Sequence, residues 1–361
     1  MKAALLRGVQ QPLTVEDVEL SAPGPREVLI RTVAAGVCHS DVHFFQGSYL
    51  YPLPAVLGHE SAGVVEEVGS EVQYVKPGDH VITCLSVFCG HCNYCLSGRP
   101  ALCGKSDTRR GPSDPPRITQ KGETVHQFLD LSSYAEAMLV HEHAIVKVRD
   151  DMPLDRAALI GCGVTTGVGA VLNTARIEPG STVAVIGCGG VGLSAIQGAR
   201  IGGAGRVIAI DTLASKLEIA QKLGATDVVN ASDGDPVAQV KELTNGGVEY
   251  SFEAIGLKLS TEQAFDMLAN GGTATVIGMI PLGTKVELNG VDFLFEKKIQ
   301  GSNMGSNRFR IDMPRYVDFY LNGKLNLDDM VSARLQLEDV NDAFQAVISG
   351  EVARQVIMFN E

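Results

Sequence analysis

The chain has 361 residues, of which 45% are hydrophobic and 20% are charged, and its formal net charge is −12 at pH 7. This length exceeds that of most single domains, so we expect two domains, each large enough to bury a core. The acidic balance excludes nucleic acid as an expected partner, because a phosphate backbone is bound by a basic face.

The N-terminal stretch MKAALLRGVQQP holds only a short apolar run, which Arg7 interrupts. Such a run is too short for the core of a secretory signal, and no uninterrupted apolar segment predicts a membrane span. We therefore expect a cytoplasmic protein with no membrane partner. In a reducing compartment the eight cysteines are better explained as metal ligands than as disulfides.

Up to about residue 150 the chain consists of short β-type runs separated by Gly and Pro. These runs are EVLIRTVAAGV, AGVVEEVGS, VKPGDHVIT and YAEAMLVHEHAIVKV. Runs of this length and spacing predict a β-rich, barrel-like domain.

Three separate motifs contain candidate metal ligands. Cys38 lies in GVCHSDVH, His59 in LGHESAG and Cys162 in GCGVTTG. Together they would make a Cys2His set that leaves one tetrahedral position for water or an alcohol, as in catalytic zinc sites. No spacing rule connects residues so far apart, so a buried Cys162 without a metal remains the alternative.

A second set of candidate metal ligands lies within one short run of sequence. The run CGHCNYCLSGRPALC places four cysteines in the spacing Cys-x2-Cys-x2-Cys-x7-Cys, namely Cys89, Cys92, Cys95 and Cys103. Four thiolates fill a tetrahedral zinc site completely and leave no position for chemistry, so we expect a structural zinc. Two disulfides or four unconnected thiols are the alternatives.

The segment Gly104–Gly122 is rich in Pro, Gly, Arg and Lys. This composition is typical of a solvated surface loop. The alternative is that the segment borders a subunit contact or the mouth of a pocket.

From about Asp151 strand-like and helix-like runs alternate, which predicts a parallel sheet with right-handed crossovers. The runs are STVAVIG, GLSAIQGARIGGA, RVIAID, the helical TEQAFDMLAN (261–270) and the strand GTATVIGMI (272–280). Beyond about Met304, PRYVDFYLNGKL and LEDVNDAFQAVISG have helical periodicity.

The run Gly187-Cys188-Gly189-Gly190-Val191-Gly192 follows the first of these strands and opens a helix. Asp211 ends the next strand, at the distance expected of a dinucleotide-binding fingerprint. The glycines would admit a pyrophosphate to the helix N-terminus, and Asp211 would bind the ribose hydroxyls and repel a 2′-phosphate. NAD is therefore expected rather than NADP.

The whole chain resembles the zinc-containing medium-chain alcohol dehydrogenases, closest in pattern to the liver-type and class III-like branch. The motifs that carry the resemblance are GVCHSDVH, GHESAGVVEEVG, VKPGDHV, the four-cysteine run, HQFLDLSSYAEAMLV, GCGVTTG, GCGGVG and VARQVI. The resemblance implies NAD and two zinc ions, one catalytic and one structural, as cofactors.

By position, the resemblance implies that Cys38, His59 and Cys162 bind the catalytic zinc. Asp41 would orient His59, as metal-site physics independently expects. Glu60 would assist ligand exchange.

Ser40 would take the substrate proton and His43 would pass it towards solvent. A histidine suits this task because its pKa lies near neutral pH. The implied NAD contacts are His39, Thr166, Gly187, Gly189, Gly190, Val191, Gly192, Asp211, Lys216 and Arg354. For His39 and His43 a surface histidine is the alternative, and for Lys216 a solvated helix residue.

The resemblance also implies a mostly apolar substrate pocket formed by Leu85, Phe128, Leu129, Ile280 and Asn303. We expect primary alcohols and aldehydes, aromatic or of medium chain length, as substrates. A glutathione-adduct formaldehyde dehydrogenase is the alternative enzyme, since Arg109 and Arg110 could meet a carboxylate. A non-catalytic NAD-binding relative would have lost ligands, and none is missing from the sequence.

The implied fold is α/β. A GroES-like, β-rich catalytic domain would comprise residues 1–163 and 304–361, and a Rossmann doubly wound parallel-sheet domain would comprise residues 164–303. The stretch between Cys103 and Ser133 is longer than in tetrameric yeast-type members, so a homodimer is expected, with a homotetramer as the alternative.

Overall fold

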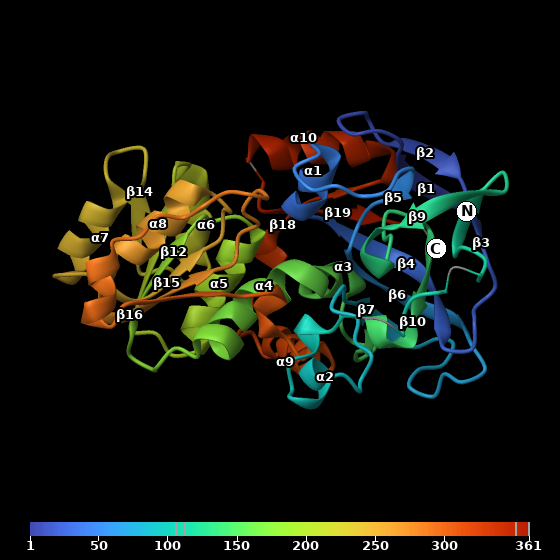
Figure 1. Ribbon diagram of the computed structural model, residues 1–361, viewed down its shortest axis with the longest axis horizontal. Coiled ribbons are helices and arrows are strands. Elements are labelled where there is room, and N and C mark those ends of the chain that lie inside the picture. The colour runs from blue at the N-terminus through green and yellow to red at the C-terminus, as the bar shows by residue number, and fades with distance from the viewer. Residues whose placement is uncertain (105–106, 112, 351, 360–361) are drawn as a thin grey trace. The chain divides into compact units, whose positions relative to one another are not determined.

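The computed structural model describes residues 1–104, 107–111, 113–350 and 352–359. The chain divides into two compact units, coloured along the sequence in Figure 1. Unit 1 comprises Met1–Cys162, Arg308–Asn322 and Val331–Glu361, and unit 2 comprises Gly163–Asn307 and Gly323–Met330. The predicted division placed residues 163, 304–307 and 323–330 in the first domain, whereas here they belong to unit 2. Within unit 2, Gln197 Nε2 donates to the Asn326 carbonyl at 3.1 Å.

The centre of unit 1 is β4 (Glu27–Val37), whose alternating apolar residues are mostly buried. It belongs to a seven-stranded sheet of order β11-β7-β6-β4-β19-β18, in which β10 also pairs with β4. The other strands are β6 (Glu60–Val68), β7 (His80–Thr83), β10 (Ala137–His141), β11 (Ile145–Lys147), β18 (Val331–Leu335) and β19 (Arg354–Met358). The C-terminal β19 pairs antiparallel with β4, so the two ends of the sequence build one sheet.

A six-stranded sheet of order β2-β1-β5-β9-β8-β3 completes the β structure described in unit 1. Its strands are β1 (Lys2–Leu6), β2 (Thr14–Asp17), β3 (Glu19–Leu20), β5 (Ala55–Val56), β8 (Ile118–Gln120) and β9 (Glu123–Gln127). The helices of unit 1 are α1 (His39–Phe45), α2 (Asn93–Leu96), α3 (Leu154–Leu159), α9 (Phe309–Leu321) and α10 (Val340–Ser349). This is the predicted β-rich domain with helices in its C-terminal part.

Helix α9 begins earlier than the sequence pattern predicted. The periodicity started at Pro314, whereas the helix starts at Phe309. The Arg308 N–H donates to the Asp312 carboxylate at 2.7 Å, which satisfies one of the free donors at the helix start.

Unit 2 contains a parallel six-stranded sheet of order β14-β13-β12-β15-β16-β17. The strands are β12 (Thr182–Ile186), β13 (Arg206–Asp211), β14 (Asp227–Asn230), β15 (Val248–Glu253), β16 (Leu268–Val276) and β17 (Lys298–Gly301). The helices are α4 (Thr165–Gly169), α5 (Gly190–Ile201), α6 (Ala214–Lys222), α7 (Pro236–Thr244) and α8 (Lys258–Asp266). Parallel strands connected by helices form the predicted Rossmann-type fold.

One strand boundary differs from the prediction. The run 261–270 was expected to be helical and 272–280 extended, but α8 ends at Asp266 and β16 already begins at Leu268. Leu268 pairs with Val248 of β15, and the register then shifts before Tyr250. Pairing with a distant strand therefore overrides the local helical periodicity.

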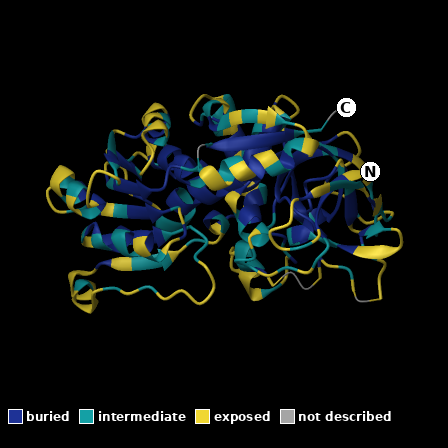
Figure 2. Cartoon of the chain, turned by 90° about the horizontal axis from the view of Figure 1, so that it is seen from above, coloured by how far each residue is buried: buried dark blue, intermediate teal, exposed yellow. Residues whose placement is uncertain are grey.

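Buried residues concentrate on the sheets and on the helix faces packed against them, whereas exposed residues lie on outer helix faces and loops (Figure 2). Among the described residues, the helical stretch Leu154–Ala175 is long and apolar enough to cross a membrane by length and composition alone. Because 83% of its apolar window is buried inside the protein, it also has the character of a core helix.

Candidate active site

Cys162 is positioned by an irregular turn of helix. It lies in a π-helical segment, Ile160–Val164, between α3 and α4. A Cβ on Gly161 would lie 3.0 Å from the Thr83 carbonyl and 3.2 Å from the Ser61 nitrogen, so a larger residue would crowd these strands. This close approach brings Cys162 Sγ to 3.2 Å from His59 Nε2.

Cys38 lies where β4 ends and α1 begins, as the N-cap residue of that helix. Its backbone N–H faces Asp41 Oδ2 at 3.4 Å, so Asp41 closes the first turn. The same carboxylate lies 2.9 Å from His59 Nδ1, which leaves Nε2 of His59 facing the cysteines. The short motif CHSD therefore supplies one sulfur ligand and orients the imidazole.

The donor atoms of Cys38, His59 and Cys162 lie within 4.8 Å of one another, and all three residues are buried. Two sulfurs and one imidazole nitrogen are the donor set that zinc prefers, and three protein ligands leave a fourth position for a reacting molecule. The residues fit a catalytic zinc.

Tyr134 also belongs to this site, although no sequence pattern predicted it. This tyrosine is fully buried, and its hydroxyl donates to Asp41 Oδ2 at 2.8 Å. Burial and the Asp41 carboxylate raise the pKa of the phenol, which keeps it protonated and able to donate. The run SSYAEA gives no indication of this hydrogen bond, because Asp41 lies 93 positions away in the sequence.

The electrostatics of the donor set favour thiolate at Cys38. A hydrogen bond from the Cys162 thiol lowers the pKa of Cys38 and outweighs the effect of burial, and the positive charge of Arg354 acts in the same direction. The same hydrogen bond, together with burial, raises the pKa of Cys162. Because metal binding requires both thiolates, it displaces this shared proton.

Glu60 and Arg354 form a buried pair. Glu60 Oε1 lies 3.1 Å from Arg354 Nε, and both residues are almost inaccessible to solvent. Arg354 also donates to the Val37 carbonyl at 3.4 Å. The structure thus places both next to β4 and Cys38, while their predicted roles in ligand exchange and pyrophosphate binding stay predictions.

The residues of the predicted proton relay lie on α1. Cys38 Sγ is 3.6 Å from Ser40 Oγ, which places this half-buried hydroxyl beside the metal donors. The rings of His39 and His43 have centroids 5.0 Å apart. Burial and the neighbouring His39 lower the pKa of His43, so its imidazole is neutral near pH 7 and can accept a proton.

An aromatic group adjoins the metal donors. The ring of Phe128 lies 6.1 Å from the ring of His59 and packs edge-on against Phe44 at 4.8 Å and Tyr51 at 5.1 Å, measured between centroids. Leu129 is half-buried against the same apolar cluster.

Of the other predicted pocket residues, Leu85 packs in a different cluster of unit 1, whereas Ile280 and Asn303 lie in unit 2. Of the predicted pocket residues in unit 1, the structure places Phe128 beside His59 and Leu129 against the apolar cluster that contains Phe128.

The side chains of the four cysteines in the run 89–103 also come together. Cys89, Cys92, Cys95 and Cys103 have sulfurs within 4.8 Å of one another, with Cys92 Sγ at 3.5 Å from Cys95 Sγ and 3.8 Å from Cys103 Sγ. A hydrogen bond from the Cys95 backbone lowers the pKa of Cys92 to about 7, whereas burial raises that of Cys95 to about 12. The cluster fits a tetrahedral zinc held by four thiolates.

In unit 2 the glycine-rich turn joins β12 to α5, as the sequence predicted. A Cβ on Gly192 would lie 1.7 Å from the Gly187 carbonyl, so this packing of helix against turn requires glycine. The Cys188 N–H donates to Asp211 Oδ2 at 2.8 Å, which brings the acid at the end of β13 against the turn. The turn and the acid together fit a dinucleotide.

The remaining predicted cofactor residues of unit 2 lie on nearby elements. Gly189 caps α5, Gly190 and Val191 open it, and Lys216 is half-buried in α6. Thr166 is buried in α4, with Oγ1 3.3 Å from Met304 Sδ. Their contacts with a cofactor stay predictions.

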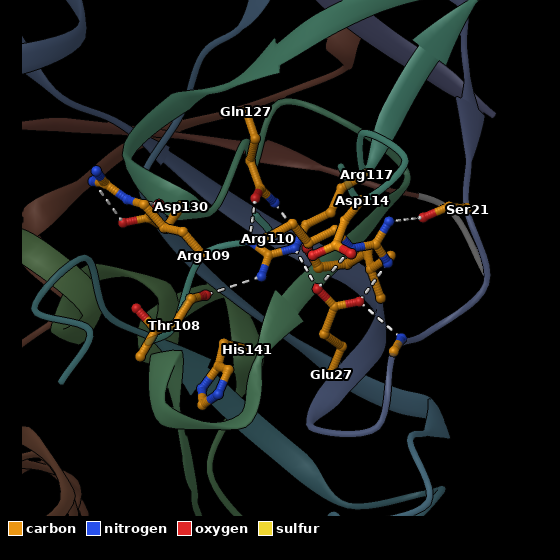
Figure 3. A network of polar contacts seen from close by, with 12 residues as sticks. Ser21, Glu27, Thr108, Arg109, Arg110, Asp114, Arg117, Gln127, Asp130 and His141 are labelled. Atoms are coloured by element: carbon orange, nitrogen blue, oxygen red, sulfur yellow. Dashed lines mark hydrogen bonds and ion pairs between the residues drawn. The ribbon is translucent and has the colours of Figure 1, made fainter. Parts of the chain in front are cut away.

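The segment 104–122 was expected to be a solvated loop, but its described arginines form ion pairs with carboxylates elsewhere in unit 1. Residues 105, 106 and 112 lie outside the described residues. Figure 3 shows Glu27 between the guanidinium groups of Arg110 and Arg117. Arg109 forms a separate pair with Asp130. With Arg109 and Arg110 bound internally, the structure adds no support for the glutathione-adduct alternative.

A β-rich unit with a buried Cys2His donor set, joined to a parallel sheet with a dinucleotide turn, defines a zinc-binding dehydrogenase. Two family profiles match: "Alcohol dehydrogenase GroES-like domain" over residues 24–150 and "Zinc-binding dehydrogenase" over residues 190–322. The first range lies within unit 1, and the second covers much of unit 2 and continues through 308–322 of unit 1.

Among solved structures, an alcohol dehydrogenase zinc-binding domain protein from Burkholderia ambifaria is 36% identical with a TM-score of 0.95, covering 100% of this chain and 99% of that one. Benzyl alcohol dehydrogenase from Acinetobacter calcoaceticus is 34% identical with a TM-score of 0.94, covering 99% of both chains. A zinc-binding dehydrogenase from Sinorhizobium meliloti bound to NADP is 28% identical with a TM-score of 0.85, covering 99% of both chains. The chain belongs to the family of zinc-containing medium-chain alcohol dehydrogenases.

Proposed function

We propose that this protein is an NAD-dependent alcohol dehydrogenase that interconverts primary aromatic alcohols and their aldehydes. The observation that carries the proposal is the buried Cys38, His59 and Cys162 donor set with the ring of Phe128 beside it. An aromatic side chain next to the reacting position favours a flat, apolar substituent on the alcohol. The 34% identity to benzyl alcohol dehydrogenase supports the same substrate class.

Zinc, when bound by these three ligands, supplies a Lewis acid that lowers the pKa of an alcohol hydroxyl. Asp41 and Tyr134 hold His59 in the orientation that presents Nε2 to the metal. Ser40, next to Cys38 Sγ, takes the proton of the alcohol, and the neutral His43 accepts it in turn.

Unit 2 would hold NAD, which would supply the hydride acceptor for the alcohol carbon. The N–H groups at the start of α5 would bind its pyrophosphate, and Asp211 would accept hydrogen bonds from the ribose hydroxyls. A negative charge at Asp211 repels the 2′-phosphate of NADP, which favours NAD although a relative binds NADP.

The direct test is the rate of cofactor reduction by the zinc-loaded protein with benzyl alcohol, using NAD and NADP in parallel. Formaldehyde with glutathione is assayed in the same buffer. We expect turnover of benzyl alcohol with NAD and a kcat/KM well above that with NADP. Turnover of the glutathione adduct without turnover of benzyl alcohol would contradict the proposal.

A further inference from the structure

We propose that Arg109 is a positioning residue that sets the size selectivity of the site by fixing the turn Phe128–Ser132, here called the 128–132 turn. The inference rests on the proposed function, because it concerns which alcohols the site accepts. Its physical basis is a strained backbone conformation that adjoins the metal donors and is clamped by a surface arginine.

The 128–132 turn has an unusual backbone. Leu129, Asp130 and Ser132 have φ values of 50°, 65° and 63°, although none of them is glycine. Left-handed conformations bring the Cβ atom close to the backbone carbonyl, and they persist only where surrounding contacts impose them. Three such residues within four positions mean that the turn is held in place from outside.

The turn begins at the metal site. Phe128 packs beside His59, and Leu129 is half-buried in the same apolar cluster. The Leu129 N–H donates to Tyr51 Oη at 3.3 Å, and the Tyr51 hydroxyl donates to the Gln127 carbonyl at 2.8 Å. A change in the turn therefore moves the apolar side chains that lie next to the reacting position.

The two ends of the turn are joined to the protein core. The Phe128 N–H donates to Ser132 Oγ at 2.8 Å, and the Ser132 hydroxyl donates to the Val56 carbonyl at 2.7 Å. The Leu131 and Ser132 N–H groups also donate to the Phe128 carbonyl, at 2.9 Å and 3.1 Å. None of these bonds involves the Asp130 side chain, which is left to other contacts.

Asp130, in the middle of the turn, is held by a bidentate ion pair with Arg109, here called the fork. Arg109 Nε donates to Asp130 Oδ1 at 2.9 Å and Nη2 donates to Oδ2 at 3.3 Å. The Asp130 side chain is only 11% exposed, whereas that of Arg109 is 60% exposed. A planar guanidinium that meets both carboxylate oxygens fixes the direction of the carboxylate as well as its position.

The segment that carries Arg109 is itself fixed by ion pairs with β4. Arg110 Nε donates to Glu27 Oε1 at 3.0 Å, and Arg117 Nε donates to the same oxygen at 2.7 Å. Figure 3 shows this network beside the Arg109–Asp130 pair. The first residue of β4 thus anchors the segment from which Arg109 reaches the turn.

The test compares Arg109→Gln, Arg109→Lys and the control Arg149→Gln. Arg149 is 58% exposed and makes a similar fork to Asp151, with Nε–Oδ1 at 2.8 Å and Nη2–Oδ2 at 2.6 Å. Each zinc-loaded variant is assayed with NAD and with benzyl alcohol or 2-naphthylmethanol. In parallel, hydrogen exchange of the backbone amides is measured for the protein without substrate.

We expect Arg109→Gln to change the ratio of kcat/KM for the two alcohols by roughly fivefold or more, mainly through KM, since small changes in an apolar pocket have effects of this size. Amide exchange should accelerate in 128–132 and stay unchanged in the remainder of unit 1. Arg109→Lys keeps the charge but cannot form the fork, so it should shift the ratio in the same direction by less. Arg149→Gln should match the wild type.

A selectivity ratio in Arg109→Gln equal to that of Arg149→Gln would overturn the proposal, even if exchange in the turn became faster. Exchange that accelerates throughout unit 1 would also overturn it, because Arg109 would then stabilise the unit in general. If the wild type oxidises neither alcohol, the proposed function fails, while local exchange in the turn still reports whether Arg109 positions it.

Discussion

At Asp41 one buried carboxylate serves several neighbours at once. It meets His59 Nδ1, the Tyr134 hydroxyl and the backbone N–H groups of Cys38 and Gly58. Each contact stabilises the negative charge of the carboxylate where no water can do so. The orientation of His59 therefore depends in part on the Tyr134 hydroxyl, which acts through Asp41.

We predict that Tyr134→Phe loosens the catalytic metal. The change removes one oxygen, leaves the volume almost unaltered and deprives Asp41 of a donor. Stability should fall by about 1–2 kcal/mol, and removal of zinc from the Cys2His site should become roughly tenfold faster, as for other residues that support metal ligands. The measurement is zinc release to a chelator, with the absorption spectrum of the cobalt-substituted protein as a second readout.

Tyr134→Phe should leave zinc in the four-cysteine cluster, which serves as the internal control. A variant with lower stability but the wild-type rate of zinc release and cobalt spectrum would show that the hydroxyl has a structural role alone.

His43→Gln tests the proton relay through its pH dependence. An imidazole accepts a proton only above its pKa, and burial and His39 lower the pKa of His43 from its ordinary value of 6.5. We expect alcohol oxidation to slow by on the order of 10²-fold near neutral pH, and by less at alkaline pH, where hydroxide takes the proton directly. The measurement is kcat against pH, and an equal loss at every pH would contradict the role.

At the scale of elements, strand β4 anchors the arginine-rich segment. Glu27 is buried at the start of β4, and although burial acts in the opposite direction, the hydrogen bonds of Arg110 and the charge of Arg117 lower its pKa to about 2. Composition predicted a solvated loop because the partners are 83 and 90 positions apart in sequence. A local pattern cannot reveal that Arg117 is as buried as the acid it meets.

We predict that Glu27→Gln destabilises unit 1 at neutral pH by roughly 3–5 kcal/mol, because it leaves a buried arginine without its anion. The pKa of Glu27 is depressed from 4.5 to about 2. Its contribution is therefore complete above pH 4.5 and is lost as the pH falls towards 2. Urea unfolding of both proteins at several pH values should show the difference shrinking below pH 4.5, and a difference independent of pH would contradict this account.

At the scale of the whole molecule, most of the architecture was predictable from the sequence. The β-rich part, the parallel sheet and the Gly187–Gly192 turn with Asp211 follow from local patterns, which burial and hydrogen bonding along one element impose. The Cys2His set was found by residue type and resemblance. Its geometry depends on a π-helical turn at Cys162 and a phenol at Tyr134, and neither has a local signature.

The two metal-binding clusters should respond differently to the loss of one cysteine. Cys162 is buried in the helical segment between α3 and α4, whereas the four-cysteine run contains one short helix, α2, and a 3-10 turn at Pro100–Leu102. We therefore predict that Cys162→Ala retains one zinc and nearly the wild-type melting temperature but has no detectable turnover.

Cys92→Ala should also retain one zinc, but it should unfold at a lower temperature, because metal binding supplies the folding energy of such a lobe. Zinc analysis, calorimetry and assays with NAD on the same samples decide the matter. A stable Cys92→Ala, or an active Cys162→Ala, would mean that the two clusters have been assigned to the wrong tasks.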